Sequence, residues 1–396
     1  MPRLTRADGP PDHTDIYMAE TPDHFETPHG VGRRDFLAVG AGAILCTIGG
    51  KKVALTKPGD AAKADAAAAM VMRPKNVPPK TNKAPATTGV AGADPVDKLT
   101  FETPQPQPGC DVVEYWIEAT DALWDIIPSR PRRDQWMGMN LPGPSVFRAF
   151  VYQEMTDGFA SPKGPAAMPG PILQARVGDV IKVHFRNGLP AKSNQAVTMH
   201  PHGVRYNPEY DGTFLGDFTR AGGYIAPGEE FTYTWECLPG SVGVWPYHDH
   251  GPNHVTNTFR GMFGALIIRE RDAKVPDVEH VLFFHQMAPP ITGLPRNYEA
   301  INGLAYTGNT PTIRSKVGDD VAIHVIGMDN NFHDFHVHGH RWLLDGTTVP
   351  TDVTTVGPNE TITARFTEDN PGRWLYHCHV FSHMDAGMSG WYIVEP

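Results

Sequence analysis

The feature that most constrains this chain is a histidine–cysteine–histidine run close to its C-terminus. His377, Cys378 and His379 directly follow Arg373-Trp374-Leu375-Tyr376, an apolar and aromatic stretch that is typical of a β-strand. Successive side chains of a strand point to opposite faces, so the two histidines share one face and the cysteine points to the other. One short strand is therefore predicted to supply two separate sets of metal ligands.

The cysteine side of this strand has further ligands nearby in the sequence. His383 and Met388 follow Cys378 in the sequence. A second histidine, His333, lies an odd number of residues before each member of the His336/His338 pair, so it faces away from that pair if the segment is extended. Two histidines, one cysteine and a weak axial methionine are the ligand set of a blue-copper electron-transfer centre. The sequence therefore predicts such a centre at these four residues.

The histidine side recurs elsewhere, because the chain contains four His-x-His pairs. Eight imidazoles are too many for one metal ion, and neutral imidazole suits copper. A cluster of three copper ions would use all eight and leave room for oxygen ligands. The pairs are His200/His202, His248/His250, His336/His338 and His377/His379.

The two ordered halves of the chain are internal repeats. Val177-Gly178-Asp179 returns as Val317-Gly318-Asp319, and Trp245-Pro246-Tyr247-His248-Asp249-His250 returns as residues 374–379. Short apolar runs are separated by turn residues, including 40 Gly and 38 Pro, and no stretch has a convincing helical period. These patterns predict an all-β protein of two β-sandwich domains. The predicted boundaries are a leader and linker at 1–100, domain 1 at 101–271 and domain 2 at 272–396.

The mismatches between the repeats are informative. Asp249 and Val197 stand in domain 1 where domain 2 has the cysteine and the upstream histidine. His254 and Met262 keep the positions of the other two ligands, but without a thiolate they cannot hold a blue-copper centre. We therefore interpret His254 and Met262 as packing residues.

The four motifs, HxHG, HxH, HxxHxH and HCHxxxHxxxxM, resemble those of the multicopper oxidases over residues 110–396. With blue copper in the second domain only, the chain is similar to the two-domain bacterial laccases. The resemblance implies two cupredoxin-like Greek-key domains and four coppers. It also implies one-electron oxidation of phenols or aromatic amines coupled to the reduction of dioxygen to water. It further implies a homotrimer in which domain 1 of one subunit meets domain 2 of the next.

The same resemblance assigns roles to single residues. An acidic group supplies protons near the copper cluster in this family, and Asp211 resembles it, although Asp211 could equally be a turn residue before Gly212. Tyr206 could hydrogen-bond beside the cluster, act as a redox-active phenol or pack at an interface. The resemblance assigns type 1 copper to His333, Cys378, His383 and Met388, type 2 copper to His200 and His336, and the type 3 pair to His202, His248, His250, His338, His377 and His379.

Three other functions compete with this one. A cuprous or ferrous oxidase stays open because Asp334 and Asp385 adjoin type 1 ligands. A two-domain copper nitrite reductase shares the fold, but its three-histidine catalytic copper would leave several of the eight histidines unexplained. Copper storage or passive electron transfer does not explain four His-x-His pairs.

The N-terminal region predicts export. Gly32-Arg33-Arg34-Asp35-Phe36-Leu37 resembles a twin-arginine signal, and a weakly hydrophobic stretch to Gly50 follows it. This predicts a periplasmic or extracellular protein, the alternative being an ordinary disordered tail. Cys110 and Cys237 could pair in such a compartment, but the sequence does not decide this.

Composition excludes two classes of partner. The net charge of −10 and the lack of a basic stripe argue against nucleic acid. No apolar run is long enough to span a membrane.

Overall fold

The computed structural model describes residues 44–48, 51–55, 94–141, 143–344 and 347–396. Near the N-terminus, β1 (Ile44–Ile48) and β2 (Lys51–Leu55) pair as an antiparallel hairpin. The arginine pair of the predicted export signal lies outside the described residues, so export stays a prediction. No described helix has the length and apolar character needed to cross a membrane.

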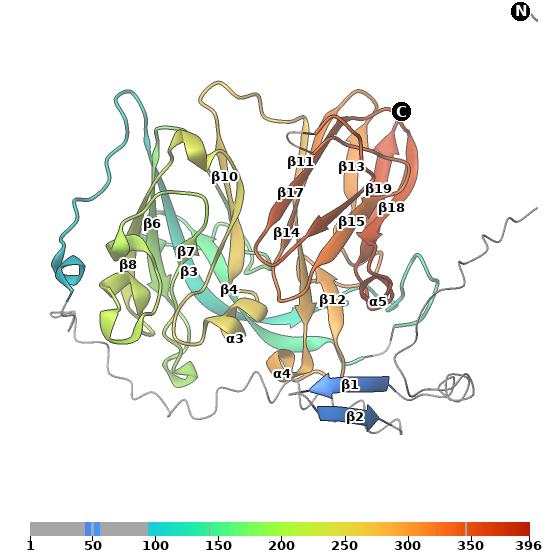
Figure 1. Cartoon of the computed structure of the whole chain (residues 1–396), viewed down its shortest axis with the longest axis horizontal. Helices are drawn as coiled ribbons and strands as arrows, with labels where there is room; N and C mark the ends of the chain where they lie inside the picture. Colours follow the sequence, from blue (N-terminus) through green and yellow to red (C-terminus); the bar gives the residue numbers. More distant parts are fainter. Residues whose placement is uncertain (1–43, 49–50, 56–93, 142, 345–346) are drawn as a thin grey trace, which may run out of the picture. The chain divides into compact units, whose positions relative to one another are not determined.

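Domain 1 is built from two four-stranded sheets (Figure 1). One has the order β4-β3-β6-β8 and the other the order β5-β10-β9-β7. Apolar side chains of both sheets meet in a common core, in which Phe185, Tyr233 and Trp235 are fully buried. The strands are β3 (Val112–Asp125), β4 (Val146–Met155), β5 (Ile172–Arg176), β6 (Val180–Asn187), β7 (His200–Pro201), β8 (Glu230–Glu236), β9 (Gly243–His248) and β10 (Phe263–Arg269).

Domain 2 repeats this plan with sheets β12-β11-β14-β17 and β13-β19-β18-β15-β16. Its core contains Phe284, Phe335 and Tyr376. The strands are β11 (Val278–Met287), β12 (Tyr298–Ile301), β13 (Ile313–Lys316), β14 (Asp320–Gly327), β15 (His333–Val337), β16 (Val353–Val356), β17 (Thr361–Thr367), β18 (Gly372–Cys378) and β19 (Ser389–Glu395).

Helices in the described residues are short and lie in the connections. Together with the sheets, they confirm the prediction of an all-β protein without long helices. The α-helices are α3 (His254–Phe259), α4 (Pro289–Thr292) and α5 (Phe381–Asp385). The 3-10 helices are η2 (Pro95–Lys98), η3 (Asp157–Phe159), η4 (Ala191–Ser193), η5 (Pro208–Tyr210), η6 (Gly216–Phe218), η7 (Ala221–Gly223) and η8 (Pro239–Ser241).

A tyrosine–glycine pair fixes the histidine-bearing strand in each domain. Tyr247 on β9 covers Gly264, and Tyr376 on β18 covers Gly390, where a Cβ atom would overlap the tyrosine ring in both cases. Each tyrosine hydroxyl also donates to a proline carbonyl, at 2.7 Å in domain 1 and 2.6 Å in domain 2. Because each tyrosine directly precedes the first histidine of a pair, this contact sets the depth of the pair in its sheet.

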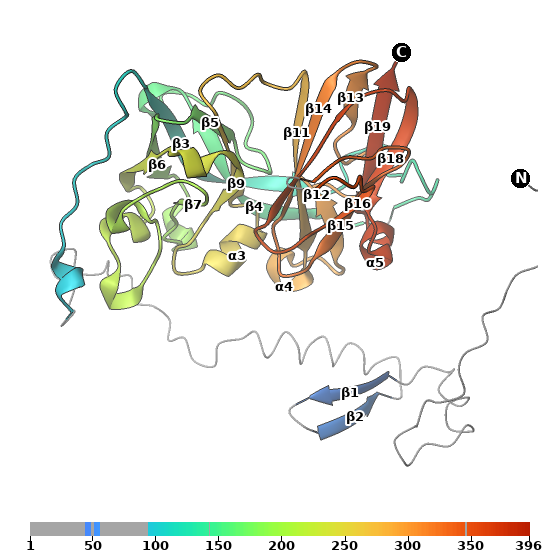
Figure 2. The same cartoon turned by 45° about the horizontal axis from the view of Figure 1, so that its top comes forward.

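The two sandwiches share an apolar core and form one compact unit (Figures 1 and 2). Phe263 of domain 1 packs against Phe283 of domain 2, with 4.9 Å between ring centroids. The connection between β3 and β4 also reaches domain 2, where Gln135 N–H donates to the Thr307 carbonyl at 2.9 Å. Packing therefore fixes the two sets of histidines relative to each other within one chain.

Candidate metal centres

Three of the four predicted type 1 ligands come together in domain 2, and the backbone of the fourth, Met388, contacts Cys378. On β15 the buried positions alternate, so that His333 points into the core with Phe335. The Nδ1 atoms of His333 and His383 lie 3.9 and 3.7 Å from Cys378 Sγ and 3.2 Å from each other. Met388 is fully buried, and its carbonyl accepts the Cys378 N–H at 3.1 Å. Two imidazole nitrogens and one sulfur therefore converge on one point.

The surroundings of Cys378 favour its thiolate form. Burial works against ionisation of Cys378, but hydrogen bonds from His333 and His383 outweigh it and lower the cysteine pKa to about 7. Burial also works against the charged form of His333, but Asp329 and Cys378 raise the pKa of this histidine to about 9. The thiolate is the form of cysteine that binds metal, so the donor set fits a blue-copper ion.

Four histidines form the domain 2 half-site on the opposite face of β15 and β18. His336 and His338 alternate with the buried residues of β15, and the His338 and His377 Nε2 atoms lie 3.2 Å apart. His336 Nδ1 donates to the Asp352 carbonyl at 2.6 Å, and His377 Nδ1 donates to the Cys378 carbonyl at 2.8 Å. A carbonyl only accepts, so in each neutral ring the proton is on Nδ1 and Nε2 keeps its lone pair for a metal. His379 completes the group, 5.4 Å from His336 between ring centroids.

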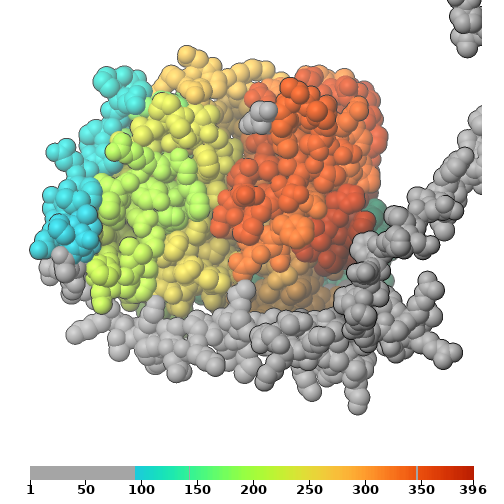
Figure 3. All heavy atoms as spheres, in the orientation of Figure 1, coloured from blue at the N-terminus to red at the C-terminus, as the bar shows by residue number. Residues whose placement is uncertain are grey.

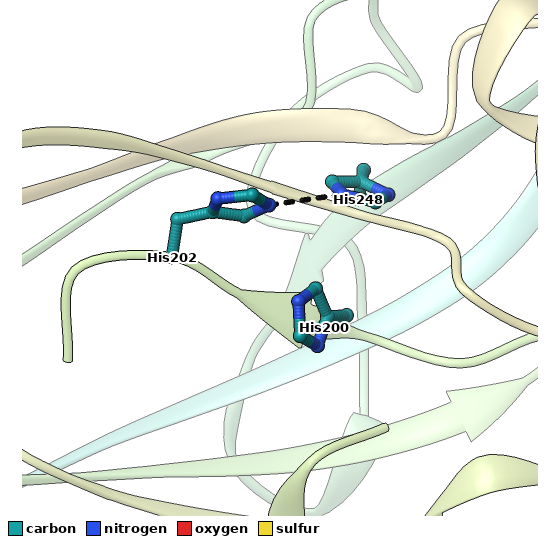
Figure 4. Close-up of side chains that lie close together, drawn as sticks. All are labelled: His200, His202 and His248. Atoms are coloured by element: carbon teal, nitrogen blue, oxygen red, sulfur yellow. Dashed lines mark hydrogen bonds between the residues drawn. The ribbon is translucent and has the colours of Figure 1, made fainter. Parts of the chain in front are cut away.

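The domain 1 half-site has the same construction (Figure 4). The His202 and His248 Nε2 atoms lie 3.1 Å apart, with the ring of His200 beside them. His200 Nδ1 donates to the Asp211 carbonyl at 2.7 Å, and His248 Nδ1 donates to the Asp249 carbonyl at 2.9 Å. Here too the carbonyl partners leave Nε2 free to bind.

Burial lowers the pKa of several of these histidines and so favours their neutral form. The pKa is lowered to about 4 for His202, to about 3 for His248 and to about 4 for His377. Burial is the largest cause of each shift, and for His202 the neighbouring histidines are the next. His250 Nδ1 is buried without a hydrogen-bond partner. Clustered neutral imidazoles with free nitrogens fit copper, which requires deprotonated ligands.

The depressed pKa values predict acid sensitivity of the copper-free protein. Unfolded histidines titrate near 6.5, whereas His248 and His377 stay neutral in the fold to about pH 3 and 4. As pH falls from about 6.5 to about 4, the unfolded state therefore binds more protons, and each histidine removes up to about 1.4 kcal/mol of unfolding free energy per pH unit. Urea unfolding of the copper-free protein across this range measures the loss. His248→Gln should make the unfolding free energy depend less steeply on pH. An unchanged pH dependence in this variant would contradict the lowered pKa of His248.

Asp249 takes the place of the cysteine in domain 1 and has a structural role there. It is fully buried, and its carboxylate accepts hydrogen bonds from the Thr198 and Gly251 N–H groups and the Asn257 amide, at 2.8, 3.2 and 3.0 Å. Burial, the largest effect, raises the pKa of Asp249 despite these bonds. The carboxylate thus holds the turn between His248 and His250.

Removing this carboxylate should destabilise domain 1. Asp249→Ala leaves three buried N–H donors without their acceptor, which we expect to lower the free energy of unfolding by about 2–4 kcal/mol. Denaturant unfolding of the copper-free protein measures the change. Asp217→Ala, at an exposed position, is the control and should change little. A loss equal to that of the control would contradict the structural role.

His254 and Met262, at the domain 1 positions equivalent to His383 and Met388, pack against neighbouring residues. His254 stacks on His250 at 4.7 Å between ring centroids, and its Nδ1 donates to the Gly251 carbonyl at 3.2 Å. Met262 is fully buried and its carbonyl accepts the Asp249 N–H, as Met388 does for Cys378. These contacts agree with the interpretation of both residues as packing residues.

Asp211 and Tyr206 both lie beside His200. Asp211 Oδ1 is 3.3 Å from His200 Nδ1, and the Tyr206 ring centroid is 5.8 Å from that of His200. Burial works to raise the pKa of Asp211, but hydrogen bonds with His200 and Thr213 bring it below its usual value. Burial, and then the Asp211 charge, raise the pKa of Tyr206. Their catalytic roles stay predictions.

Sequence reasoning missed two buried acids near the type 1 donors. Asp329 Oδ1 lies 3.3 Å from His333 Nε2, four residues away in the chain. Glu299 is 4 % exposed, and burial raises its pKa, although the Gln286 amide and the nearby charge of His383 act against this. Asp329 could have been found from the sequence, because it lies only four residues before His333. Glu299 is far in sequence from the type 1 donors, so no pattern in the sequence pointed to it.

Three further histidines and two further cysteines are not members of these donor sets. His184 and His324 occupy matching positions and hydrogen-bond to Glu114 and Glu279. His340 is buried and donates to the His338 carbonyl at 2.7 Å. Cys110 and Cys237 are free thiols in the described structure.

The two half-sites of one chain are separate. Within residues 94–396, leaving aside the undescribed positions, no ring contact or hydrogen bond joins a histidine of one half-site to a histidine of the other. The domain 1 half-site instead borders a cavity of about 320 Å³, which α3 and the domain 2 residues Met328, Asp329 and Asn359 also line. Within the described residues, each half-site is thus a cluster of four histidines from one domain.

Several known proteins are similar to this chain in sequence. Two family models, both described as multicopper oxidase, match residues 165–273 and 270–396. A probable nitrite reductase-hydroxylamine oxidoreductase fusion protein of Kuenenia stuttgartiensis is 30% identical over 244 residues, which is 58% of this chain and 28% of that protein. The human ferroxidase HEPHL1 is 29% identical over 346 residues, 71% of this chain and 29% of that protein. The chain thus spans less than a third of the length of these curated relatives.

A solved multicopper oxidase structure shares the fold. It superposes with a TM-score of 0.57 at 23% identity and covers 72% of this chain and 89% of its own. This likeness confirms the expected cupredoxin-like sandwiches. The two matching family models together span more than half of the chain, and they show that it belongs to the multicopper oxidase family.

Proposed function

We propose that this protein is a laccase-type oxidase, which oxidises phenols or aromatic amines one electron at a time and reduces dioxygen to water. One observation carries the proposal. A single chain holds one thiolate donor set and two four-histidine half-sites. Domain 1 has no second thiolate set, because Asp249 occupies the position that the cysteine has in domain 2. Copper bound at these donors would supply one-electron redox chemistry and storage of the four electrons that dioxygen requires.

The residues of the chain connect the proposed electron entry to the half-site. His333, Cys378, His383 and Met388 would hold type 1 copper, and Cys378 lies between His377 and His379 in the covalent chain. The hydrogen bond from His377 Nδ1 to the Cys378 carbonyl adds a second connection of 2.8 Å. The thiolate set is therefore joined to the half-site by a few bonds within one strand.

Assembly completes the proposal. Because the half-sites of one chain are separate, we propose that the domain 1 half-site of one copy meets the domain 2 half-site of the next, in a closed homotrimer. Head-to-tail contacts of this kind close into rings. Asp211, with its carboxylate 3.3 Å from His200, would then hold and deliver a proton beside the cluster.

A copper count with visible and EPR spectra tests the activity class. We expect four coppers per chain, an intense thiolate-to-copper absorption at roughly 600 nm, and distinct type 1 and type 2 EPR signals. Two coppers per chain without a coupled pair would instead indicate a nitrite-reductase-like site and overturn the proposal.

A ferrous or cuprous oxidase is the second candidate, and two buried carboxylates favour it. Glu299 Oε2 and Asp329 Oδ2 are buried without hydrogen-bond partners near the type 1 donors, and one relative is named a ferroxidase. Comparing kcat/KM for Fe²⁺, Cu⁺ and a phenol separates the candidates. A metal oxidase should have the higher kcat/KM for Fe²⁺ or Cu⁺ and should lose it in Glu299→Gln, whereas a laccase should have the higher kcat/KM for the phenol in both forms.

We also propose that the protein is exported, on the strength of the arginine pair at 33 and 34. N-terminal sequencing of protein recovered from the periplasm or medium tests this. An intact N-terminus on protein confined to the cytoplasm would contradict it.

A further inference from the structure

A short N-terminal segment lies across the loop that carries Asp211. We propose that this segment, residues 94–103 and here called the N-terminal strap, is a latch that holds the domain 1 half-site in its copper-binding form. Figure 3 shows it at the edge of domain 1, in the cyan at the start of the coloured chain. The inference rests on the proposed function in one respect, namely that the half-site binds copper.

Three polar contacts fasten the strap to domain 1. Thr103 Oγ1 and the Tyr210 hydroxyl lie 3.0 Å apart, and the Asn207 amide donates to the Glu102 carbonyl at 3.2 Å. At the other end, Arg220 donates to the Asp97 carbonyl at 3.1 Å. Two of the three contacts thus reach η5 and its N-cap residue, immediately before Asp211.

The turn that the strap holds sets the orientation of a copper ligand. Asp211 directly follows η5, and its carbonyl accepts the His200 Nδ1 proton at 2.7 Å. Gly212 packs so closely on the backbone of Met199 that a Cβ atom there would overlap it. A shift of this turn therefore moves the acceptor that fixes the His200 tautomer and ring, and such partners of a ligating histidine tune metal affinity strongly.

The strap bridges a cavity and does not pack as core. The cavity is about 240 Å³, and Asp211 and Thr213, which both contact His200, form part of its wall. Leu99 on the strap and Leu215 on the loop line the same cavity and remain about half exposed. With little apolar burial to hold it, closure of the strap depends on its polar contacts, and a segment of this kind opens at low free-energy cost.

The latch has a reciprocal consequence. If closing the strap favours copper at His200, copper at His200 must favour the closed strap by the same factor. Amide hydrogen exchange in residues 94–103 should therefore be slower in the copper-loaded protein than in the copper-free protein. A strap that only adds general stability would not respond to the metal in this way.

The experiment removes one fastening contact and follows each kind of copper separately. Thr103→Val and Tyr210→Phe each remove one hydroxyl of the Thr103–Tyr210 hydrogen bond, whereas Thr103→Ser keeps a hydroxyl at position 103. Thr100→Val is the control, because Thr100 is on the strap but has no hydrogen bond to any residue that the structure describes. Fully loaded protein is mixed with excess EDTA, and the type 2 EPR signal and the type 1 absorption band are followed with time.

We expect the type 2 signal to decay about five- to tenfold faster in Thr103→Val and Tyr210→Phe, as the loss of one hydrogen bond predicts. Thr103→Ser and Thr100→Val should match the wild type, and the type 1 band should keep its wild-type rate in all variants. Equal acceleration of both signals, or none, would overturn the latch. The wild-type copper count reports independently on the proposed function, so the two failures are distinguishable.

Discussion

Replacing Cys378 by serine should abolish the type 1 absorption band and lower turnover by at least about a thousandfold, since in the proposed oxidase every electron from the reductant enters through this thiolate site. A hydroxyl at this position has neither the low pKa nor the soft character of the Cys378 thiol, whose pKa is about 7 in the fold. Visible spectra and steady-state oxidation of a phenol measure the two effects.

Two further measurements make this result specific. Cys110→Ser is the matched control, because Cys110 is also a free thiol but lies outside the three donor sets, and it should leave both spectrum and turnover unchanged. The type 2 EPR signal of Cys378→Ser should persist, because the half-sites remain. Retention of appreciable turnover without the absorption band would show that electrons enter elsewhere.

The second large effect is recovery of activity by mixing two inactive variants. His202→Ala disables the domain 1 half-site, and His338→Ala disables the domain 2 half-site, so each variant alone should be inactive. When both are co-expressed with different tags and purified by both tags, every mixed three-membered ring contains one intact pairing of half-sites. We therefore expect about a third of wild-type activity per chain.

This experiment separates pairing between copies from pairing within a chain. Mixed rings as inactive as the parents would show that the half-sites do not combine between chains. As a control, wild-type chains mixed with a chain that carries both substitutions should recover about half as much per chain, because only one of the two kinds of mixed ring keeps an intact pairing.

Much of the site could be predicted because strand geometry is local. The two-residue period of β15 placed His333 on the buried face and His336 and His338 on the other, as the structure has them. The period depends only on the backbone, so no knowledge of the surrounding fold was needed. The repeat relation between the halves similarly located Asp249 in the place of a cysteine.

The rest could not be predicted, because it depends on where distant segments pack. The Asp211 carbonyl that fixes His200 and the strap contact between Thr103 and Tyr210 join residues on separate loops. Glu299 reaches the type 1 site only through the fold of domain 2. Loop paths of this kind follow no periodic pattern, so the sequence alone carries no signal for them.

The core that the two sandwiches share has a consequence for symmetry. In a ring built by joining unlike half-sites, the rotation from one copy to the next equals the angle between the two half-sites of a single chain. That angle is set by contacts such as Phe263 against Phe283, deep inside each subunit. In the proposed ring, the number of subunits is thus encoded in the interior of the chain, and a repacked interior would change the assembly without altering its contact surface.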